Sequence, residues 1–288
     1  MHVLLTNDDG IHAPGLWALQ RVFSARNQVT VVAPDRERSA VGHGITLHRP
    51  IHFEEIRLVT GQTGLAVNAK PADCVKLGLA ELLTDPPDLV VSGINPGANV
   101  GINLNYSGTV AAAKEAAMAG IPALAVSIVA PGERHIDSAA QFVESLARQL
   151  MRHGLPRGTF LNVNLPDLPM RDVRGVRWSR QGTEMVVQHF EKRRDPRDRI
   201  YYWQGCDRQD AYAEADIDGV VLAERYISIT PIKCDMTDYA TLGELQRWEI
   251  PPAPEPADVP RPVCRRRSER RSSIMATMTS TTTTPRMA

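Results

Sequence analysis

The sequence has few cysteines, and those it has are far apart. The 288 residues hold four, Cys74, Cys206, Cys234 and Cys264, and no two of them form a CxxC pair. A chain of this length seldom depends on a disulfide framework, and a thiolate zinc site needs closely spaced cysteines. We therefore expect free thiols with no part in the chemistry.

The chain also lacks long apolar runs and any excess of charge. No apolar segment approaches the roughly 20 residues of a membrane-spanning helix, and no basic segment precedes an apolar one at the N-terminus. Because 33 basic residues balance 33 acidic ones, the whole chain has no electrostatic bias toward nucleic acid or membrane. We expect a soluble, cytoplasmic protein with no membrane partner and no specific nucleic-acid partner.

Common nucleotide-binding and hydrolase motifs are missing too. No GxGxxG follows the first predicted strand, and no GxxxxGK[ST] occurs, which argues against dinucleotide-binding and P-loop sites. Ser127 follows an apolar run but lacks the GxSxG surroundings of a hydrolase nucleophile. The chemistry of this chain must use another arrangement of residues.

The first half of the sequence alternates short apolar runs with amphipathic stretches. This alternation is typical of a parallel sheet with crossover helices, so the predicted fold class is α/β. The predicted strands are residues 1–6, 28–33, 87–91, 121–128 and 159–165, and the predicted helices are residues 14–25, 71–83, 109–119 and 136–152.

The composition changes near residue 171 and again at residue 251. Residues 171–250 are rich in charged and aromatic side chains, and residues 220–232 resemble a strand, so we interpret this segment as a β-rich extension that serves packing or oligomerisation. Residues 251–288 cannot bury a core and are expected to be disordered. Their run of three arginines could touch RNA or acidic lipid, although a solvated tail explains it. Residues 1–170 then form the catalytic core.

Two adjacent carboxylates, Asp8 and Asp9, follow the first predicted strand in the run TNDDG. The carboxyl ends of strands are where open α/β sheets bind ligands, and two carboxylates so close repel unless a cation or proton lies between them. Oxygen ligands favour Mg²⁺, Mn²⁺ or Ca²⁺. The alternative is that one Asp caps the helix beginning near Pro14 while the other is solvated.

Two later loops add neutral oxygen donors at the same edge of the predicted sheet. Ser39 follows the second strand in DRERS, and Asn95 follows the strand at residues 87–91 in SGIN. Each of them alone is more typical of a turn. Together with Asp8 and Asp9 they predict the oxygen shell of one hard cation.

The next loop leads into a helix whose start is suited to an anion. Asn99 precedes the run Tyr106-Ser107-Gly108-Thr109, which opens the helix at residues 109–119. Free backbone N–H groups and the helix dipole favour a phosphate there, with Ser107 or Thr109 as hydrogen-bond donors. Simple capping by one of these hydroxyls is the alternative.

Taken together, these motifs resemble the SurE family of stationary-phase survival proteins. The matching runs are VLLTNDDG, APDRERSAVGHGIT, SGINPGANVG, YSGTVAAAKEAA, GIPALAVS, LNVNLP and CDMTDY, in order over about residues 1–239. The chain departs from the family at Ala69-Lys70-Pro71, where Gly-Thr-Pro is common, and at residues 102–105, which contain no acid. The resemblance implies a Rossmann-like α/β core with a C-terminal β extension used in dimerisation.

The resemblance also implies an activity and its residues. Members of the family are metal-dependent nucleotidases that hydrolyse nucleoside 5'-monophosphates, 3'-monophosphates and, in some cases, short polyphosphate. It implies one Mg²⁺ or Mn²⁺ per subunit, in a homodimer or homotetramer. The metal ligands would be Asp8, Asp9, Ser39 and Asn95, and the substrate phosphate would contact Asn99, Ser107, Gly108 and Thr109.

Two mechanisms and two other functions stay open at this point. Asp8 and Asp9 are the expected catalytic residues: either the metal orients a water whose proton goes to a carboxylate, preferably Asp9, or Asp8 attacks phosphorus itself. The chain could instead be a regulatory protein that binds metal and nucleotide without turnover. It could also bind nucleic acid through its arginine-rich tail.

Overall fold

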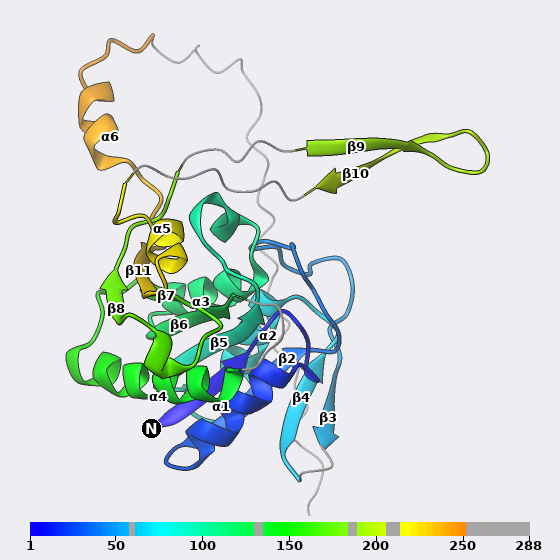
Figure 1. Ribbon diagram of the computed structural model, residues 1–288, viewed down its shortest axis with the longest axis vertical. Helices are drawn as coiled ribbons and strands as arrows, with labels where there is room; N and C mark the ends of the chain where they lie inside the picture. Colours follow the sequence, from blue (N-terminus) through cyan, green and yellow to red (C-terminus); the bar gives the residue numbers. More distant parts are fainter. Residues whose placement is uncertain (58–60, 130–134, 184–188, 206–213, 252–288) are drawn as a thin grey trace, which may run out of the picture. The chain divides into compact units, whose positions relative to one another are not determined.

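The computed structural model describes residues 1–57, 61–129, 135–183, 189–205 and 214–251 (Figure 1). Contacts along the chain divide it into two units, Met1–Met236 and Thr237–Ala288. The second unit contains helix α6 (Tyr239–Leu245), which is capped by the side chain of Asp238. The boundaries predicted at residues 170 and 250 stay predictions. The predicted disordered tail and its arginine run lie outside the described residues, except for Pro251.

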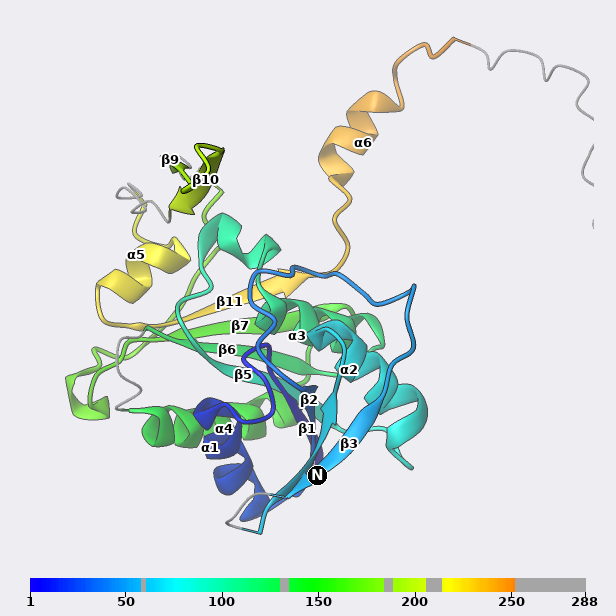
Figure 2. The ribbon, with the colours of Figure 1, turned by 90° about the vertical axis from the view of Figure 1, so that its right-hand side faces the viewer.

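The first unit is built on one sheet. Within the described ranges this sheet has nine strands in the order β3-β4-β2-β1-β5-β6-β7-β11-β8 (Figure 2). Neighbours from β4 to β7 pair in parallel, whereas β3 and β11 are antiparallel to their neighbours β4 and β7. The strands are β1 (His2–Thr6), β2 (Gln28–Pro34), β3 (Phe53–Arg57), β4 (Thr63–Val67), β5 (Leu89–Pro96), β6 (Ala123–Ile128), β7 (Thr159–Leu165), β8 (Val176–Trp178) and β11 (Ile227–Lys233).

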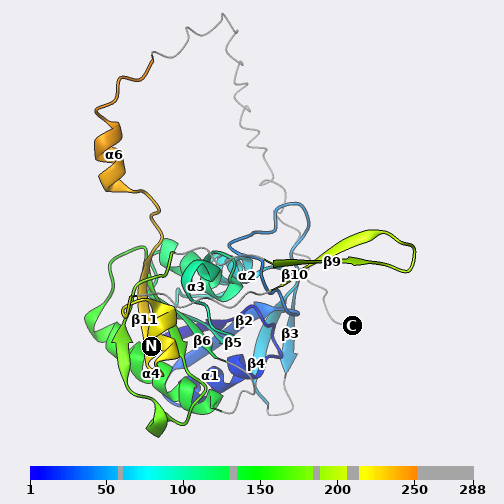
Figure 3. The ribbon, with the colours of Figure 1, turned by 45° about the horizontal axis from the view of Figure 1, so that its top comes forward.

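Helices cover both faces of the sheet. Helices α1 (Pro14–Ser24) and α4 (Ile136–His153) contact each other on one face, and α2 (Pro71–Leu77) and α3 (Gly108–Met118) contact each other on the opposite face (Figures 2 and 3). Because both faces are covered, the central strands are apolar without alternation. Residues Val3, Leu4 and Leu5 of β1, for example, are fully buried. The predicted α/β fold class with a Rossmann-like core is confirmed.

The order of the strands reverses at β1. The chain passes from β1 to β2 and β4 on one side, and then from β5 to β6 and β7 on the other. Loops that leave the carboxyl ends of β1 and β5 therefore diverge, and open α/β sheets bind ligands in the crevice that this divergence creates. The strand order alone therefore predicts a ligand site at the loops after these two strands.

The segment after residue 171 is only partly as predicted. The extra strands β8 and β11 are present and join the edge of the main sheet. The strand predicted at residues 220–232 is wrong in its first part, because Asp218–Ala223 form helix α5 and the strand begins at Ile227. A short apolar run does not by itself distinguish a buried strand from one face of a short helix. Strands β3 and β4 were not predicted.

A separate hairpin completes the extension. Strands β9 (His189–Arg194) and β10 (Ile200–Gly205) pair only with each other among the described strands, in antiparallel register. All of their residues are exposed. A two-stranded hairpin of this kind is marginally stable in water unless something covers it.

Two of the four cysteines lie within the described residues. Cys74 and Cys234 are free, and burial raises the pKa of the Cys74 thiol far above its usual range, which makes it unreactive. Cys206 and Cys264 lie outside the described residues.

Among the helices of the described ranges, none combines the length and apolar character needed to cross a membrane. The expected cytoplasmic location stays a prediction.

Phe23 belongs to the apolar core, and its substitution tests the assignment of that core. Its ring on α1 is fully buried in the larger apolar cluster. We expect Phe23→Ala to lower the free energy of unfolding by about 3–5 kcal/mol, because the substitution leaves a cavity. Urea denaturation followed by circular dichroism measures this, with Phe53→Ala as the control, since that ring is half exposed. Equal losses for the two variants would contradict the assignment of the core.

Candidate functional site

Loop segments meet at the carboxyl ends of β1 and β2. The backbone N–H of Arg38, after β2, donates to the carbonyl oxygen of Asp8, after β1, at 2.7 Å. The N–H of Ile11 likewise donates to Pro34 O at 2.8 Å. These backbone bonds fix the loop after β2 against the loop after β1.

Two glycines allow the loops to come this close. A Cβ atom on Gly10, whose φ is +98°, would lie 2.8 Å from the carbonyl carbon of Arg36. A Cβ on Gly15, in α1, would lie 2.2 Å from the carbonyl oxygen of Ile94, in β5. A larger residue at either position would force the neighbouring segments apart, so packing requires glycine at both.

Asp8 lies at the bottom of this junction, against the start of α3. It is 4% exposed, and the hydroxyl of Thr109 donates to its Oδ1. A Cβ on Gly108 would lie 2.7 Å from the Cβ of Asp8 and 2.9 Å from its Oδ2. The structure therefore brings three of the predicted site residues, Asp8, Gly108 and Thr109, into direct contact.

Burial and hydrogen bonding act on Asp8 in opposite directions. Burial raises the pKa of its carboxyl group, while the hydroxyl of Thr109 and the backbone groups of Gly108 and Thr109 lower it. The burial effect is the larger. The ionised carboxylate is consequently a costly group here, and a nearby positive charge would stabilise it.

Asp9 is less buried than Asp8, and the turn that carries both is closed by Asn7. The side-chain nitrogen of Asn7 donates to Gly10 O at 2.9 Å, and its oxygen accepts from Gly10 N at 3.2 Å. Asn7 is fully buried. Sequence reasoning assigned it no role, although asparagine at the start of a tight turn is typical of this geometry.

Ser39 lies on the loop after β2, whereas Asn95 lies near the end of β5, because this strand continues beyond its predicted end at residue 91. Each side chain is engaged locally. The hydroxyl of exposed Ser39 donates to Glu37 Oε1 at 2.6 Å. The amide nitrogen of Asn95 donates to Gly97 O at 2.6 Å, which leaves its Oδ1 as an acceptor. Within the described residues, no three His, Cys, Asp or Glu side chains are placed to hold a metal. A metal shell here would need these two neutral oxygens beside the two aspartates, so the ligand set stays a prediction.

Asn99 belongs to a buried polar network. Its Nδ2 donates to Ser127 Oγ at 2.8 Å, and its backbone N–H donates to Asn164 Oδ1 at 2.8 Å. Its carbonyl oxygen accepts from Asn162 Nδ2 at 2.8 Å and from Asn164 Nδ2 at 3.0 Å. Sequence reasoning missed the two asparagines of β7. Polar residues at alternating positions of a fully buried strand could have indicated them, because such groups must be hydrogen-bonded.

Ser107 is the N-cap of α3. Its Oγ accepts from Val110 N at 3.2 Å, and its side chain is nearly buried. The capping alternative is therefore realised, while the hydroxyl proton of Ser107 is still able to donate to an anion. Ser107 also borders a cavity of about 160 Å³ whose polar lining residues include His43, Asn105, Lys114, Gln181 and Lys233.

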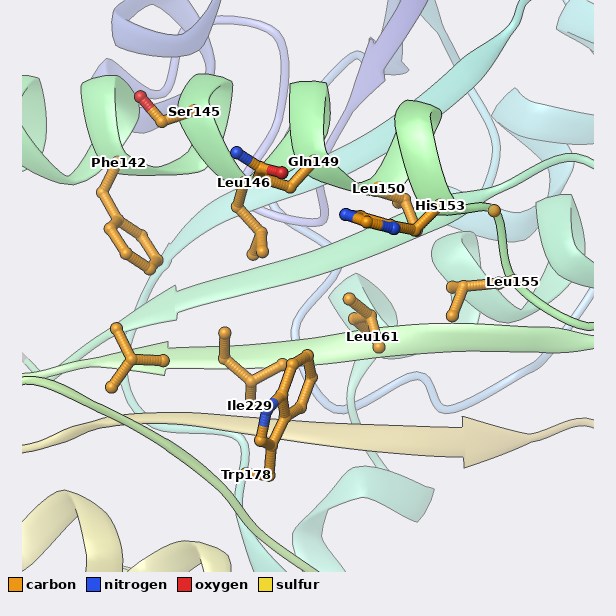
Figure 4. A pocket seen from close by; sticks show the side chains of 12 residues that line it. Phe142, Ser145, Leu146, Gln149, Leu150, His153, Leu155, Leu161, Trp178 and Ile229 are labelled. Atoms are coloured by element: carbon orange, nitrogen blue, oxygen red, sulfur yellow. The ribbon is translucent and has the colours of Figure 1, made fainter.

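A larger cavity lies elsewhere and has different chemistry. Its volume is about 540 Å³, and it lies between α4 and strands β7, β8 and β11 (Figure 4). Apolar side chains such as Phe142, Leu161 and Trp178 point into it. It contains none of the predicted site residues, so size alone does not identify the functional site.

Comparison with known proteins identifies the family of the chain. A family model described as "Survival protein SurE" matches residues 3–188. The 5'-nucleotidase SurE of Desulfatibacillum aliphaticivorans is 54% identical over 87% of this chain and 99% of its own length. The 5'-nucleotidase SurE of Pelobacter propionicus is 47% identical over 86% and 99%. The crystal structure of the Sure protein from Aquifex aeolicus is 34% identical, with a TM-score of 0.75 over 85% of this chain and 98% of that one. The chain belongs to the SurE family.

Proposed function

We propose that this chain hydrolyses nucleoside 5'-monophosphates to nucleoside and phosphate, with one Mg²⁺ or Mn²⁺ per subunit. The observation that carries the proposal is the contact between the buried Asp8 and the start of α3, in a chain whose relatives are named 5'-nucleotidases. A carboxylate and a helix N-terminus at one point suit a metal ion and a phosphate, respectively.

The residues present fit a hard cation. Asp8 and Asp9 supply carboxylate oxygens, and Ser39, on the loop after β2, and Asn95, near the end of β5, supply neutral oxygens. Such an all-oxygen set favours Mg²⁺ or Mn²⁺ over metals that prefer nitrogen or sulfur. A bound cation would also offset the cost of burying the Asp8 carboxylate. When bound, it would polarise a phosphoryl oxygen and make water more acidic.

The chain's own groups divide the remaining work. Thr109 and Gly108 fix the orientation of the Asp8 carboxylate. Asp9, the more accessible of the pair, accepts the proton of the attacking water. Attack by Asp8 itself is the competing route, and trapping of an acyl phosphate on Asp8 would favour it over water attack.

The phosphate-side residues lie at the start of α3 and in the loop before it. Ser107 and the backbone of Gly108 and Thr109 stabilise the charge that develops on the phosphoryl oxygens. Asn99 contributes the second hydrogen of its Nδ2, since the first is donated to Ser127. Hydrolysis of 3'-monophosphates and of short polyphosphate at the same site forms part of the proposal.

The first test is phosphate release from a panel of nucleotides with Mg²⁺ or Mn²⁺. We expect turnover of 5'-monophosphates, and we expect Asp8→Asn and Asp9→Asn each to lower kcat by about 10²–10⁴-fold, as for the loss of a positioned acid or base. Asp85→Asn, an exposed carboxylate at the opposite end of β5, is the matched control. Full turnover in either site variant would exclude the assignment. No release by the wild type would favour a regulatory protein that binds without turnover.

Metal binding can be tested without turnover. A metal that binds only the folded chain at 100 times its Kd stabilises it by about 2.7 kcal/mol. We therefore expect Mn²⁺ to raise the Tm of the chelator-treated wild type and of Asp85→Asn, but not that of Asp8→Asn. An equal rise in all three proteins would place the metal elsewhere.

We also propose that the hairpin β9–β10 forms the contact of a homodimer or homotetramer. Phe190, Tyr202 and Trp203 are more than half exposed on it. Tyr202 and Trp203 are consecutive in β10 and therefore point to opposite faces, so both faces of the hairpin carry exposed aromatic side chains of the kind that mark interaction surfaces. Coverage by a second copy would also stabilise an otherwise marginal hairpin.

Sedimentation velocity checks this oligomer. We expect the wild type to sediment as a dimer or tetramer, and the double variant Tyr202→Glu with Trp203→Glu to shift toward the monomer, because two charges would be buried in the contact. Leu47→Glu introduces a charge at an exposed apolar residue outside the hairpin and should leave the oligomer intact. An unchanged double variant would rule out the hairpin as the contact.

A further inference from the structure

The loop between Asn99 and Ser107 is held at both backbone groups of one residue, Gly101. The N–H of Gly101 donates to Asp218 Oδ2 at 2.9 Å, and its carbonyl oxygen accepts from Gln181 Nε2 at 2.9 Å. Asp218 is 117 residues away in sequence and Gln181 is 80 residues away. Gly101 begins a single 3₁₀ turn, Gly101–Asn105, that leads directly to Ser107. We call residues 99–107 the phosphate-side loop.

Asp218 is an unusual residue for a purely structural contact. It is fully buried, and besides Gly101 it accepts from Gly182 N at 3.3 Å and from Gly219 N at 2.8 Å, both through Oδ1. Burial raises the pKa of its carboxyl group, and these three backbone N–H groups lower it. A buried acid is rare because its charge is costly to desolvate. The burial of Asp218 therefore indicates a role for its hydrogen bonds.

Both side chains lie at the base of the extension. We define the arm as residues 183–216, which contain the hairpin β9–β10. Its base is closed by two backbone bonds: Arg180 N donates to Asp216 O at 3.0 Å, and Asp218 N donates to Arg180 O at 2.9 Å. Gln181 therefore lies where the chain enters the arm, and Asp218 lies where the chain leaves it. The base of the arm is hydrogen-bonded to the phosphate-side loop.

We propose that Asp218 and Gln181 are positioning residues, which hold the phosphate-side loop in its substrate-binding geometry from the base of the arm. The inference rests on the proposed function, because it takes this loop to contact the substrate phosphate. Asn99 is fixed from the sheet by Ser127, Asn162 and Asn164. Gly101 is fixed from the arm, so correct spacing of Asn99 and Ser107 needs both attachments.

Asp218→Asn is the sharpest test because it changes one acceptor and almost no volume. The amide can keep its oxygen toward Gly182 and Gly219, but it then presents an NH₂ group to the N–H of Gly101. We expect KM for a nucleoside 5'-monophosphate to rise about tenfold while kcat changes less than threefold, as for the loss of an interaction that binds the ground state and the transition state equally. Gln181→Glu, which places an oxygen against Gly101 O, should act in the same direction.

The matched control is Asp216→Asn. Asp216 is also at the base of the arm, but its exposed carboxylate pairs with Arg180 at 2.9 Å and does not contact the loop. Its KM should equal that of the wild type within twofold. Hydrogen exchange of residues 99–107 gives a readout that does not depend on activity, and we expect faster exchange in Asp218→Asn than in Asp216→Asn.

The outcomes separate the positioning role from the proposed function. An unchanged KM and unchanged exchange in Asp218→Asn would overturn the inference, and so would parallel losses of kcat, Tm and substrate affinity, which indicate general destabilisation. A wild type that releases no phosphate overturns the proposed function. In that case, faster exchange confined to residues 99–107 would still show that Asp218 holds the loop.

Discussion

The structure depends on one close approach, between the start of α3 and the carboxylate of Asp8. The absence of a side chain on Gly108 permits it, since a Cβ there would collide with Asp8. The approach places an acidic group beside the positive end of a helix dipole, which partly compensates the loss of solvation. The position of Asp8 also restricts its neighbours. A carboxylate held here must be accommodated by the turn after β1, the loop after β2 and the loop after β5. The absence of a side chain at Gly10 and Gly15 fits that requirement, because a Cβ at either position would collide with a neighbouring segment.

The sheet explains why the approach occurs at this place. Strand order reverses between β1 and β5, so the loops after these strands diverge and leave room at the carboxyl edge. Helix α3 connects β5 to β6 on one face, and its N-terminus points back to that edge. The buried network of Asn99, Ser127, Asn162 and Asn164 then links the loop before α3 to strands β6 and β7. Two neighbouring strands of the sheet thus carry side chains that fix the phosphate-side loop, and the rigidity of the core is transmitted to the proposed site.

Sequence reasoning found what depends on local pattern and missed what depends on distant contacts. Strands β1, β5 and β6 were predictable because fully apolar runs bounded by turns are typical of central parallel strands. Asp8, Asp9, Ser39 and Asn95 were identified as candidates because each follows such a strand. Strand β3 escaped because it is at the edge of the sheet and largely exposed, which removes the apolar pattern. Asp218 escaped for a different reason: its partners, Gly101 and Gly182, are bonded through backbone groups, and any residue carries those.

Through the contacts at its base, an extension can acquire a role in a site that it does not form. An arm attached only to the edge of the sheet could change without consequence for the loops at the carboxyl end. Here the residues at its base reach Gly101 through one carboxylate and one amide, so the arm and the phosphate-side loop share an anchor. A buried carboxylate accepts strong hydrogen bonds only in a defined geometry, and displacement of the base would therefore strain or release the loop.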